Sequence, residues 1–233
     1  SFVFVTNNFV YAQVIITERS NLSADVSRNG QLVINLSGEI WTSKEDGNEL
    51  QQLTKNLHTA NRPSWSPNAT KIVYSASKNN QENIYITNFD TGKTENLSTN
   101  SNIEIYPSWN PDNQRIVFSS NSESDGLNLW ELNTQTSFRQ QLTDLPGDEV
   151  EGAWSSDGKN LVFVHHKDNW WSLILRSQNQ PDEILLKSKH KIAAPSWRPD
   201  GSLITFFKTH PSGINIEMII LSSPRVIRKY ASN

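Results

Sequence analysis

Short apolar segments alternate with polar turns along most of this chain, and one such pattern occurs four times. In each copy a tryptophan ends a short apolar segment, four turn-forming residues follow, and a second segment with alternating apolar positions begins at once. The tryptophans are Trp65, Trp109, Trp154 and Trp197, at intervals of 44, 45 and 43 residues. A regular interval of this length predicts a repeat architecture in which each copy forms one structural unit.

Each copy predicts four β-strands. The turn after the tryptophan is rich in Pro, Asn, Asp, Ser and Gly, which are the residues that tight turns select. An aromatic residue stands nine positions after every tryptophan, which predicts the same hairpin register in all four copies. Third strands are expected at 84–86, 127–132, 172–175 and 216–221, each followed by a turn and a fourth strand. Four antiparallel strands in about 44 residues make up one β-propeller blade.

The whole chain, residues 1–233, is therefore predicted to be a single all-β domain, a β-propeller of four-stranded antiparallel blades. We expect six blades, one of them incomplete, with residues 1–20 as the outer strands of the incomplete blade. In the first full repeat Val26 stands at the tryptophan position. This departure is expected, since terminal repeats are often degenerate. Residues 1–12 have an alternative interpretation as the end of an export signal, since Tyr11-Ala12-Gln13 is similar to a signal-peptidase site. The repeats are placed at 24–54, 62–99, 106–143, 151–187 and 194–230.

Composition narrows the classes of function. The chain has 21 basic and 24 acidic residues and a net charge of -3, with no visible basic stripe, so we expect no nucleic-acid partner. Its mean hydropathy is -0.57 and no apolar run approaches the length of a membrane span, so membrane insertion is not expected. Cysteine is absent, which excludes disulfides and thiolate metal sites but fits either an oxidising or a reducing compartment.

The repeats carry a family resemblance. The segments PSWSPNATKIVYSAS and PSWNPDNQRIVFSS, with the LT or LS that ends each copy, resemble the W-S-P-D-G-x-x-I-x-F repeat of the TolB-type, WD-repeat-like propeller. Related blades occur in the propeller parts of prolyl oligopeptidase-like and tricorn peptidases. The resemblance implies a six-bladed propeller that binds other proteins through its loops and performs no chemistry. It does not extend to the small α/β domain that precedes the propeller in the periplasmic TolB protein.

Enzymatic alternatives find little support in the residues. A peptidase of the oligopeptidase class needs a G-x-S-x-G nucleophile elbow, and the nearest segment, 209–213, lacks its first glycine. A metal-dependent lyase would need several histidines and carboxylates converging on one mouth. His165 and His166 are adjacent and would point to opposite faces of a strand, while His58, His190 and His210 are expected in exposed loops without partners. We therefore expect no catalytic residue, no metal and no cofactor.

The four tryptophans are expected to be core residues. A large flat ring near the inner strand fills the wedge between neighbouring twisted sheets. Trp65, Trp109, Trp154 and Trp197 are thus assigned to packing rather than to binding.

Binding is expected at one rim, where loops before the first strands and loops between second and third strands meet. Charges of both signs occur there, which suits a protein or peptide partner. Trp170 and Trp171 are adjacent, so one of them is expected to be exposed as an anchor, the alternative being that both serve packing. The residues assigned to this rim are Arg62, Tyr106, Asp148, Glu149, Glu151, His165, His166, Asp168 and Trp170.

Two functions follow from the sequence. The first is a monomeric, noncatalytic protein-interaction scaffold in the bacterial periplasm or another exported location, with the cytoplasm as the alternative compartment. The second is the propeller part of a larger peptidase, in which it gates a catalytic domain outside these residues.

Overall fold

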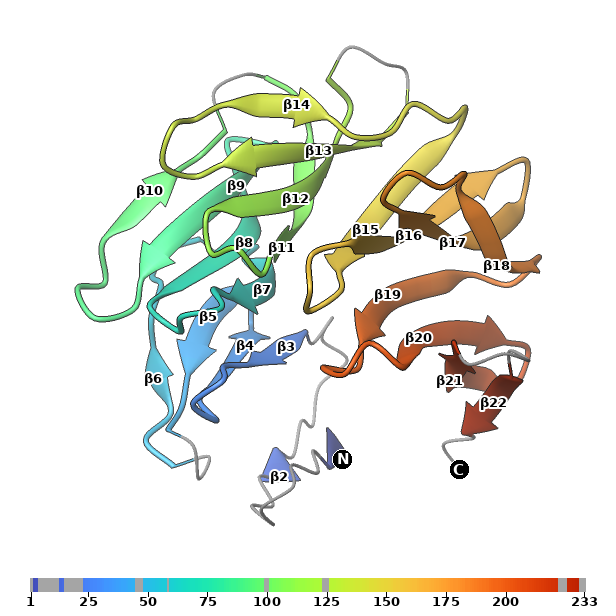
Figure 1. Ribbon diagram of the computed structural model, residues 1–233. Helices are drawn as coiled ribbons and strands as arrows, with labels where there is room; N and C mark the ends of the chain where they lie inside the picture. Colours follow the sequence, from blue (N-terminus) through green and yellow to red (C-terminus); the bar gives the residue numbers. More distant parts are fainter. Residues whose placement is uncertain are drawn as a thin grey trace. The chain divides into compact units, whose positions relative to one another are not determined.

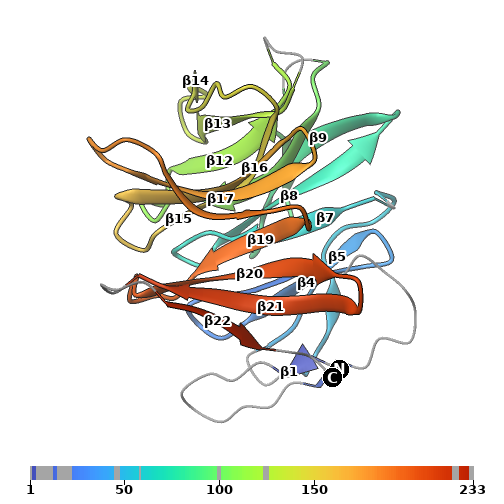
Figure 2. The ribbon, with the colours of Figure 1, turned by 90° about the vertical axis from the view of Figure 1, so that its right-hand side faces the viewer.

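The structure is a computed structural model that describes residues 2–3, 13–14, 23–44, 48–57, 59–98, 101–122, 126–221 and 226–230. Within these ranges the regular elements are all β-strands (Figures 1 and 2). The chain divides into two compact units, Ser1–Pro107 and Ser108–Asn233, and the boundary lies inside one strand. Across the described ranges no helix has the length and apolar composition needed to cross a membrane.

The first unit contains two four-stranded antiparallel sheets. One has the order β3-β4-β5-β6 and consists of β3 (Ala24–Val26), β4 (Leu32–Leu36), β5 (Glu39–Thr42) and β6 (Gln51–Gln52). The other has the order β10-β9-β8-β7 and consists of β7 (Asn61–Trp65), β8 (Lys71–Lys78), β9 (Gln81–Asn88) and β10 (Thr94–Asn96). A separate two-stranded sheet pairs β1 (Phe2–Val3) with β2 (Gln13–Val14).

The remaining three sheets follow in chain order. The sheet β11-β12-β13-β14 contains the unit boundary within its first strand and consists of β11 (Glu104–Trp109), β12 (Arg115–Ser120), β13 (Asn128–Asn133) and β14 (Arg139–Gln141). The next consists of β15 (Asp148–Trp154), β16 (Asn160–Lys167), β17 (Trp170–Ser177) and β18 (Glu183–Ser188). The last consists of β19 (Ile192–Trp197), β20 (Leu203–His210), β21 (Gly213–Ile220) and β22 (Val226–Tyr230).

Five propeller blades are therefore described, one for each predicted repeat, and the prediction of six blades is wrong. The two N-terminal strands pair with each other, Phe2 opposite Val14 and Val3 opposite Gln13, and form a sheet of their own. These two short strands belong to none of the five described blades, and their assignment as the outer strands of an incomplete blade stays a prediction. The remainder of residues 1–20, including most of the segment with the alternative export-signal interpretation, lies outside the described residues.

The turn after the first strand has the same backbone form in every blade. Its fourth residue has a positive φ, which Gly adopts freely and which Asn tolerates better than most residues. Gly30, four residues after Val26, also has a positive φ, so the turn after Val26 resembles the turns after the tryptophans. The five φ values are 82° at Gly30, 59° at Ala69, 62° at Asn113, 68° at Gly158 and 72° at Gly201.

Apolar residues of neighbouring blades form the core within each unit. In the first unit Trp65 packs with Val33 and Tyr74 and meets the ring of Phe89 edge-on, with 5.0 Å between ring centroids. In the second unit one cluster joins β12 and β13 to β16 and β17, and another joins β16 and β17 to β19, β20 and β21. Of the repeat tryptophans, Trp65 and Trp109 are buried, whereas Trp154 and Trp197 are half-buried and pack against these clusters.

Candidate binding surface

The hairpin of β16 and β17 places two tryptophans side by side. Asp168 and Asn169 form its two-residue turn with φ of 50° and 63°, and Asp and Asn are among the residues that tolerate this conformation in tight hairpins. The turn pairs Lys167 with Trp170 and His166 with Trp171. Successive strand residues face opposite sides of a sheet, so the indoles of Trp170 and Trp171 lie on opposite faces.

The two tryptophans have different environments. Trp171 is half-buried against the apolar cluster of β16 to β21, and the ring of His166 stacks on it at 4.1 Å. Trp170 is 38% exposed, and the Nζ atoms of Lys187 and Lys189 lie 5.0 and 5.5 Å from its ring centroid. Cations at these distances interact favourably with the negative face of an indole. Trp170 is therefore a side chain held in place by its neighbours while it still faces solvent.

Three lysines line this region at alternate positions of the chain. Lys187 lies in β18, Lys189 and Lys191 follow it, and all three are exposed. The Nζ atom of Lys191 lies 5.8 Å from the ring centroid of Trp171. Among the described residues none of the three lysines forms an ion pair. We call the set of Trp170, Trp171, Lys187, Lys189 and Lys191 the lysine–tryptophan surface.

Of the carboxylates close to this surface, Asp168 is exposed in the turn before Trp170, whereas Asp148 and Glu217 already have partners. Asp148 accepts a hydrogen bond from the backbone N–H of Leu127 at 3.1 Å and lies 3.9 Å from Nδ1 of His166. Glu217 is buried, 3.7 Å from Nζ of Lys208 and 3.2 Å from Nε2 of His210. Three exposed lysines against the one exposed carboxylate of Asp168 leave the lysine–tryptophan surface positive. Lys187 was not singled out from the sequence, although the alternation in KSKHK at 187–191 could have indicated it.

Glu149, which the sequence assigned to the binding rim, is not part of an exposed acidic edge. Its side chain has no exposed surface, because the residue lies inside β15 opposite His165 and points into the sheet. The backbone N–H of Leu145 donates a hydrogen bond to its Oε2 at 3.1 Å, and it also hydrogen-bonds with Thr143. Burial raises the pKa of Glu149 from 4.5 to about 7.

The same arrangement occurs in three blades. A Thr or Ser hydroxyl near the end of the outer strand accepts a hydrogen bond from the backbone N–H of a third-strand residue. The same hydroxyl also hydrogen-bonds with the carboxylate of a buried glutamate. In the first unit Thr54 accepts from Ile40 at 2.8 Å and donates to Glu39 at 2.7 Å. Ser98 likewise accepts from Ile84 and donates to the buried Glu104 at 2.6 Å. In the second unit Thr143 accepts from Leu129 at 2.8 Å and bonds Glu149. We call these three sites the glutamate latches.

Arg62, Tyr106 and Glu151 occupy equivalent positions, three residues before a repeat tryptophan. Each has a left-handed backbone, with φ of 52°, 58° and 58°. The ladder shifts register around Arg62 and Glu151, which marks a β-bulge in the inner strand. In the first unit the guanidinium of Arg62 lies 5.2 Å from the ring centroid of Tyr106, and in the second the carboxylate of Glu151 accepts the backbone N–H of Ala194. These contacts join neighbouring inner strands within each unit.

The histidines are engaged rather than free. His165 bonds the backbone carbonyl of Pro146 at 3.0 Å, while His166 stacks on Trp171, so the two point to different environments as expected. The expectation that His190 and His210 lack partners is wrong. Their rings stack with 5.5 Å between centroids, and His210 hydrogen-bonds with Glu217. His210 ends β20 and Glu217 lies in β21, the strand that pairs with β20. His58 lies outside the described residues. No group of three or more His, Asp or Glu side chains able to hold a metal ion occurs in the described part of the chain.

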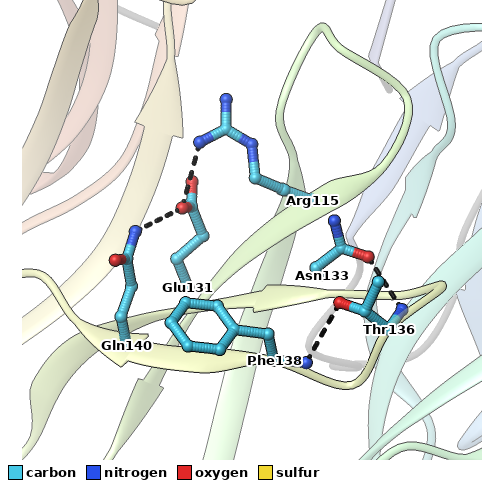
Figure 3. A pocket seen from close by; sticks show the side chains of 6 residues that line it. All are labelled: Arg115, Glu131, Asn133, Thr136, Phe138 and Gln140. Carbon is cyan, nitrogen blue, oxygen red and sulfur yellow. Dashed lines mark hydrogen bonds and ion pairs between the residues drawn. The ribbon is translucent and has the colours of Figure 1, made fainter.

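A pocket of about 310 Å³ lies on the sheet of β12, β13 and β14 (Figure 3). Figure 3 shows Arg115 and Gln140 converging on Glu131, whose Oε2 accepts from both, at 3.1 and 2.8 Å. Arg115 also pairs with Asp112. Phe138, 63% exposed, forms another part of the lining. The two charged residues that line this pocket, Arg115 and Glu131, pair with each other. The pocket lining therefore has no net charge, in contrast to the lysine–tryptophan surface.

Comparison with known proteins identifies the repeat family. The family model described as TolB beta propeller domain matches residues 37–229. No curated protein matches the sequence.

Solved structures share the fold at low sequence identity. The TolB of Acinetobacter baumannii has a TM-score of 0.80 and 16% identity over 94% of this chain, which spans 56% of the length of that protein. A TolB-like protein of Agrobacterium tumefaciens has a TM-score of 0.78 and 14% identity over 89% of this chain and 79% of its own. A puromycin-hydrolysing peptidase of Mycobacterium tuberculosis has a TM-score of 0.67 and 12% identity over 89% of this chain and 36% of its own. At such identities the likeness concerns the fold alone.

Proposed function

Because the chain belongs to the TolB beta propeller domain family, we propose that it is a noncatalytic propeller that binds another protein. One observation carries this proposal: Trp170 is 38% exposed between two lysines. Tryptophan is enriched at interaction hot spots, because a large rigid ring buries much area on binding at little cost in conformational entropy. The two flanking lysines restrict the ring further, so less freedom is lost when a partner covers it.

The proposed location is the bacterial periplasm. The family is named for TolB, a periplasmic protein, and this proposal rests on that membership. Fractionation of cells expressing the full-length protein, with periplasmic and cytoplasmic marker enzymes, tests this point. Recovery with the cytoplasmic marker would reject it.

A second candidate function is the propeller part of a larger peptidase. The specific observation in its favour is the puromycin-hydrolysing peptidase, of which this chain covers only 36% at a TM-score of 0.67. In that case the lysine–tryptophan surface would contact a catalytic domain of the same polypeptide. Sequencing of the complete reading frame separates the two, since a hydrolase domain in the same frame supports this candidate.

A capture experiment tests the favoured function. The protein, immobilised, is incubated with envelope extract, and the retained proteins are quantified by mass spectrometry for wild type, Trp170→Ala and Phe138→Ala. Both substitutions remove an exposed aromatic ring, but Phe138 lies at the pocket of β12–β14 and serves as the matched control. We expect Trp170→Ala to lose a specific partner that wild type and Phe138→Ala retain. Equal retention by all three proteins would contradict the proposal.

A further inference from the structure

The lysine–tryptophan surface has a geometry that suits one kind of partner. Lys187 pairs with Ser172 in the ladder of β18 and β17, and Lys189 follows directly after β18. Both lysines lie over Trp170, whereas Lys191 lies over Trp171, which faces the other side of the sheet. A row of two cations beside one exposed indole matches carboxylates at alternate positions of an extended peptide.

The position of the row in the fold supports the same partner. β18 is the edge strand of its sheet, beside β17 (Figure 1). Edge strands are the usual docking place for extended segments, which align along them and present alternate side chains to the same face. β18 also exposes Ile184, 58% of which is accessible, so the edge offers apolar contact besides the lysines.

Charge decides between an acidic peptide and other polyanions. Nucleic acids and anionic membranes bind through broad basic stripes or clusters of about four to eight cations. Here only two exposed lysines lie beside Trp170 and a third beside Trp171, in a chain with a net charge of -3. These lysines form no ion pairs with described residues, Asp148 and Glu217 have partners of their own, and Asp168 adds one exposed carboxylate at the hairpin turn. A short acidic segment fits this footprint better than a long polyanion does.

We infer that the lysine–tryptophan surface binds an extended acidic peptide segment of a partner protein, with carboxylates at alternate positions meeting Lys187 and Lys189 and an apolar side chain covering Trp170. This inference rests on the proposed binding function and names the chemistry of its partner.

The test uses a defined probe. A fluorescent peptide of about eight residues, alternating Glu and Thr, is titrated with the full chain and followed by anisotropy. We expect binding that weakens as the salt concentration rises, no binding of the Gln-for-Glu peptide, and an affinity loss of about tenfold or more in Lys187→Glu/Lys189→Glu. Lys78→Glu/Lys159→Glu, which changes the net charge equally at two other exposed lysines, is expected to bind like wild type.

Three results would overturn the inference. They are equal binding by both double variants, binding of the Gln peptide as tight as that of the Glu peptide, and tighter lysine-dependent binding to anionic vesicles or duplex DNA than to the peptide. Failure here is distinguishable from failure of the proposed function. If Trp170→Ala loses a captured partner but the acidic peptide does not bind, the binding function stands and only the acidic character of the partner is rejected.

Discussion

Glu149 is a single residue whose expected exposure differs from its burial in the structure. In the sequence Asp148, Glu149 and Glu151 stand together as a charged edge. In the fold the alternation of β15 turns Glu149 inward, where its side chain has no exposed surface, while Asp148 remains half-buried beside His166. Substituting Glu149 would therefore disturb folding, so this residue is unsuited to a test of partner binding. The strand was predictable, but the side that each carboxylate faces was not, because a β-bulge shifts the register between Val150 and Ala153.

Glu149 also makes a prediction about pH. Its pKa in the folded protein is about 7, above the ordinary value of 4.5, so the native state binds this proton more tightly than the unfolded chain does. The resulting stabilisation is complete below about pH 4.5 and is lost as the pH rises through about 7. Between about pH 5 and about pH 8 we expect the free energy of unfolding of wild type to fall by on the order of 2–3 kcal/mol more than that of Glu149→Gln.

Urea unfolding of both proteins at the two pH values measures this difference. Asp168→Asn removes one carboxylate at an exposed turn and is the matched control, expected to follow wild type. A pH dependence of Glu149→Gln that is indistinguishable from wild type would show that Glu149 does not titrate in this range.

At the scale of the element, the glutamate latches explain a recurrent signal. An LT or LS ends three of the five repeats in the sequence, and it marks the hydroxyl that accepts a hydrogen bond from a third-strand N–H in those blades. Its carboxylate partner was not predictable from spacing. Glu104 and Glu149 come from the start of the following blade, whereas Glu39 comes from within its own sheet, where Ala60 stands at the position of the other two.

Thr143→Val tests the latch. Valine keeps the shape of threonine but removes the acceptor of the Leu129 N–H and the hydroxyl that bonds Glu149, leaving buried polar groups unpaired. We expect a loss of about 1–3 kcal/mol in the free energy of unfolding and faster hydrogen exchange at the Leu129 amide. Thr136→Val, at an exposed turn, is expected to stay within about 0.5 kcal/mol. Equal effects of the two substitutions would mean that the latch adds nothing to stability.

At the scale of the whole molecule, the repeat period predicted the four-stranded blades and located all five of those described. Periodicity succeeds there because each blade is a local unit of consecutive hairpins. The assignment of residues 1–20 to an incomplete blade stays a prediction, since their described strands pair only with each other. The lysine–tryptophan surface was predicted only in part, through Trp170, because the contacts of Lys187 and Lys189 with that indole depend on how β18 lies beside β17.

Site-specific photo-crosslinking tests the central claim, that this surface binds a partner protein, most directly. A photoreactive phenylalanine analogue replaces Trp170 in one full-length protein and Phe138 in another, since both rings are exposed. After irradiation in cells, the cross-linked peptides are identified by mass spectrometry. The account predicts a specific protein adduct at position 170, through a segment rich in Asp and Glu, and none at position 138. Adducts at position 138 alone, or the same adducts at both positions, would contradict it.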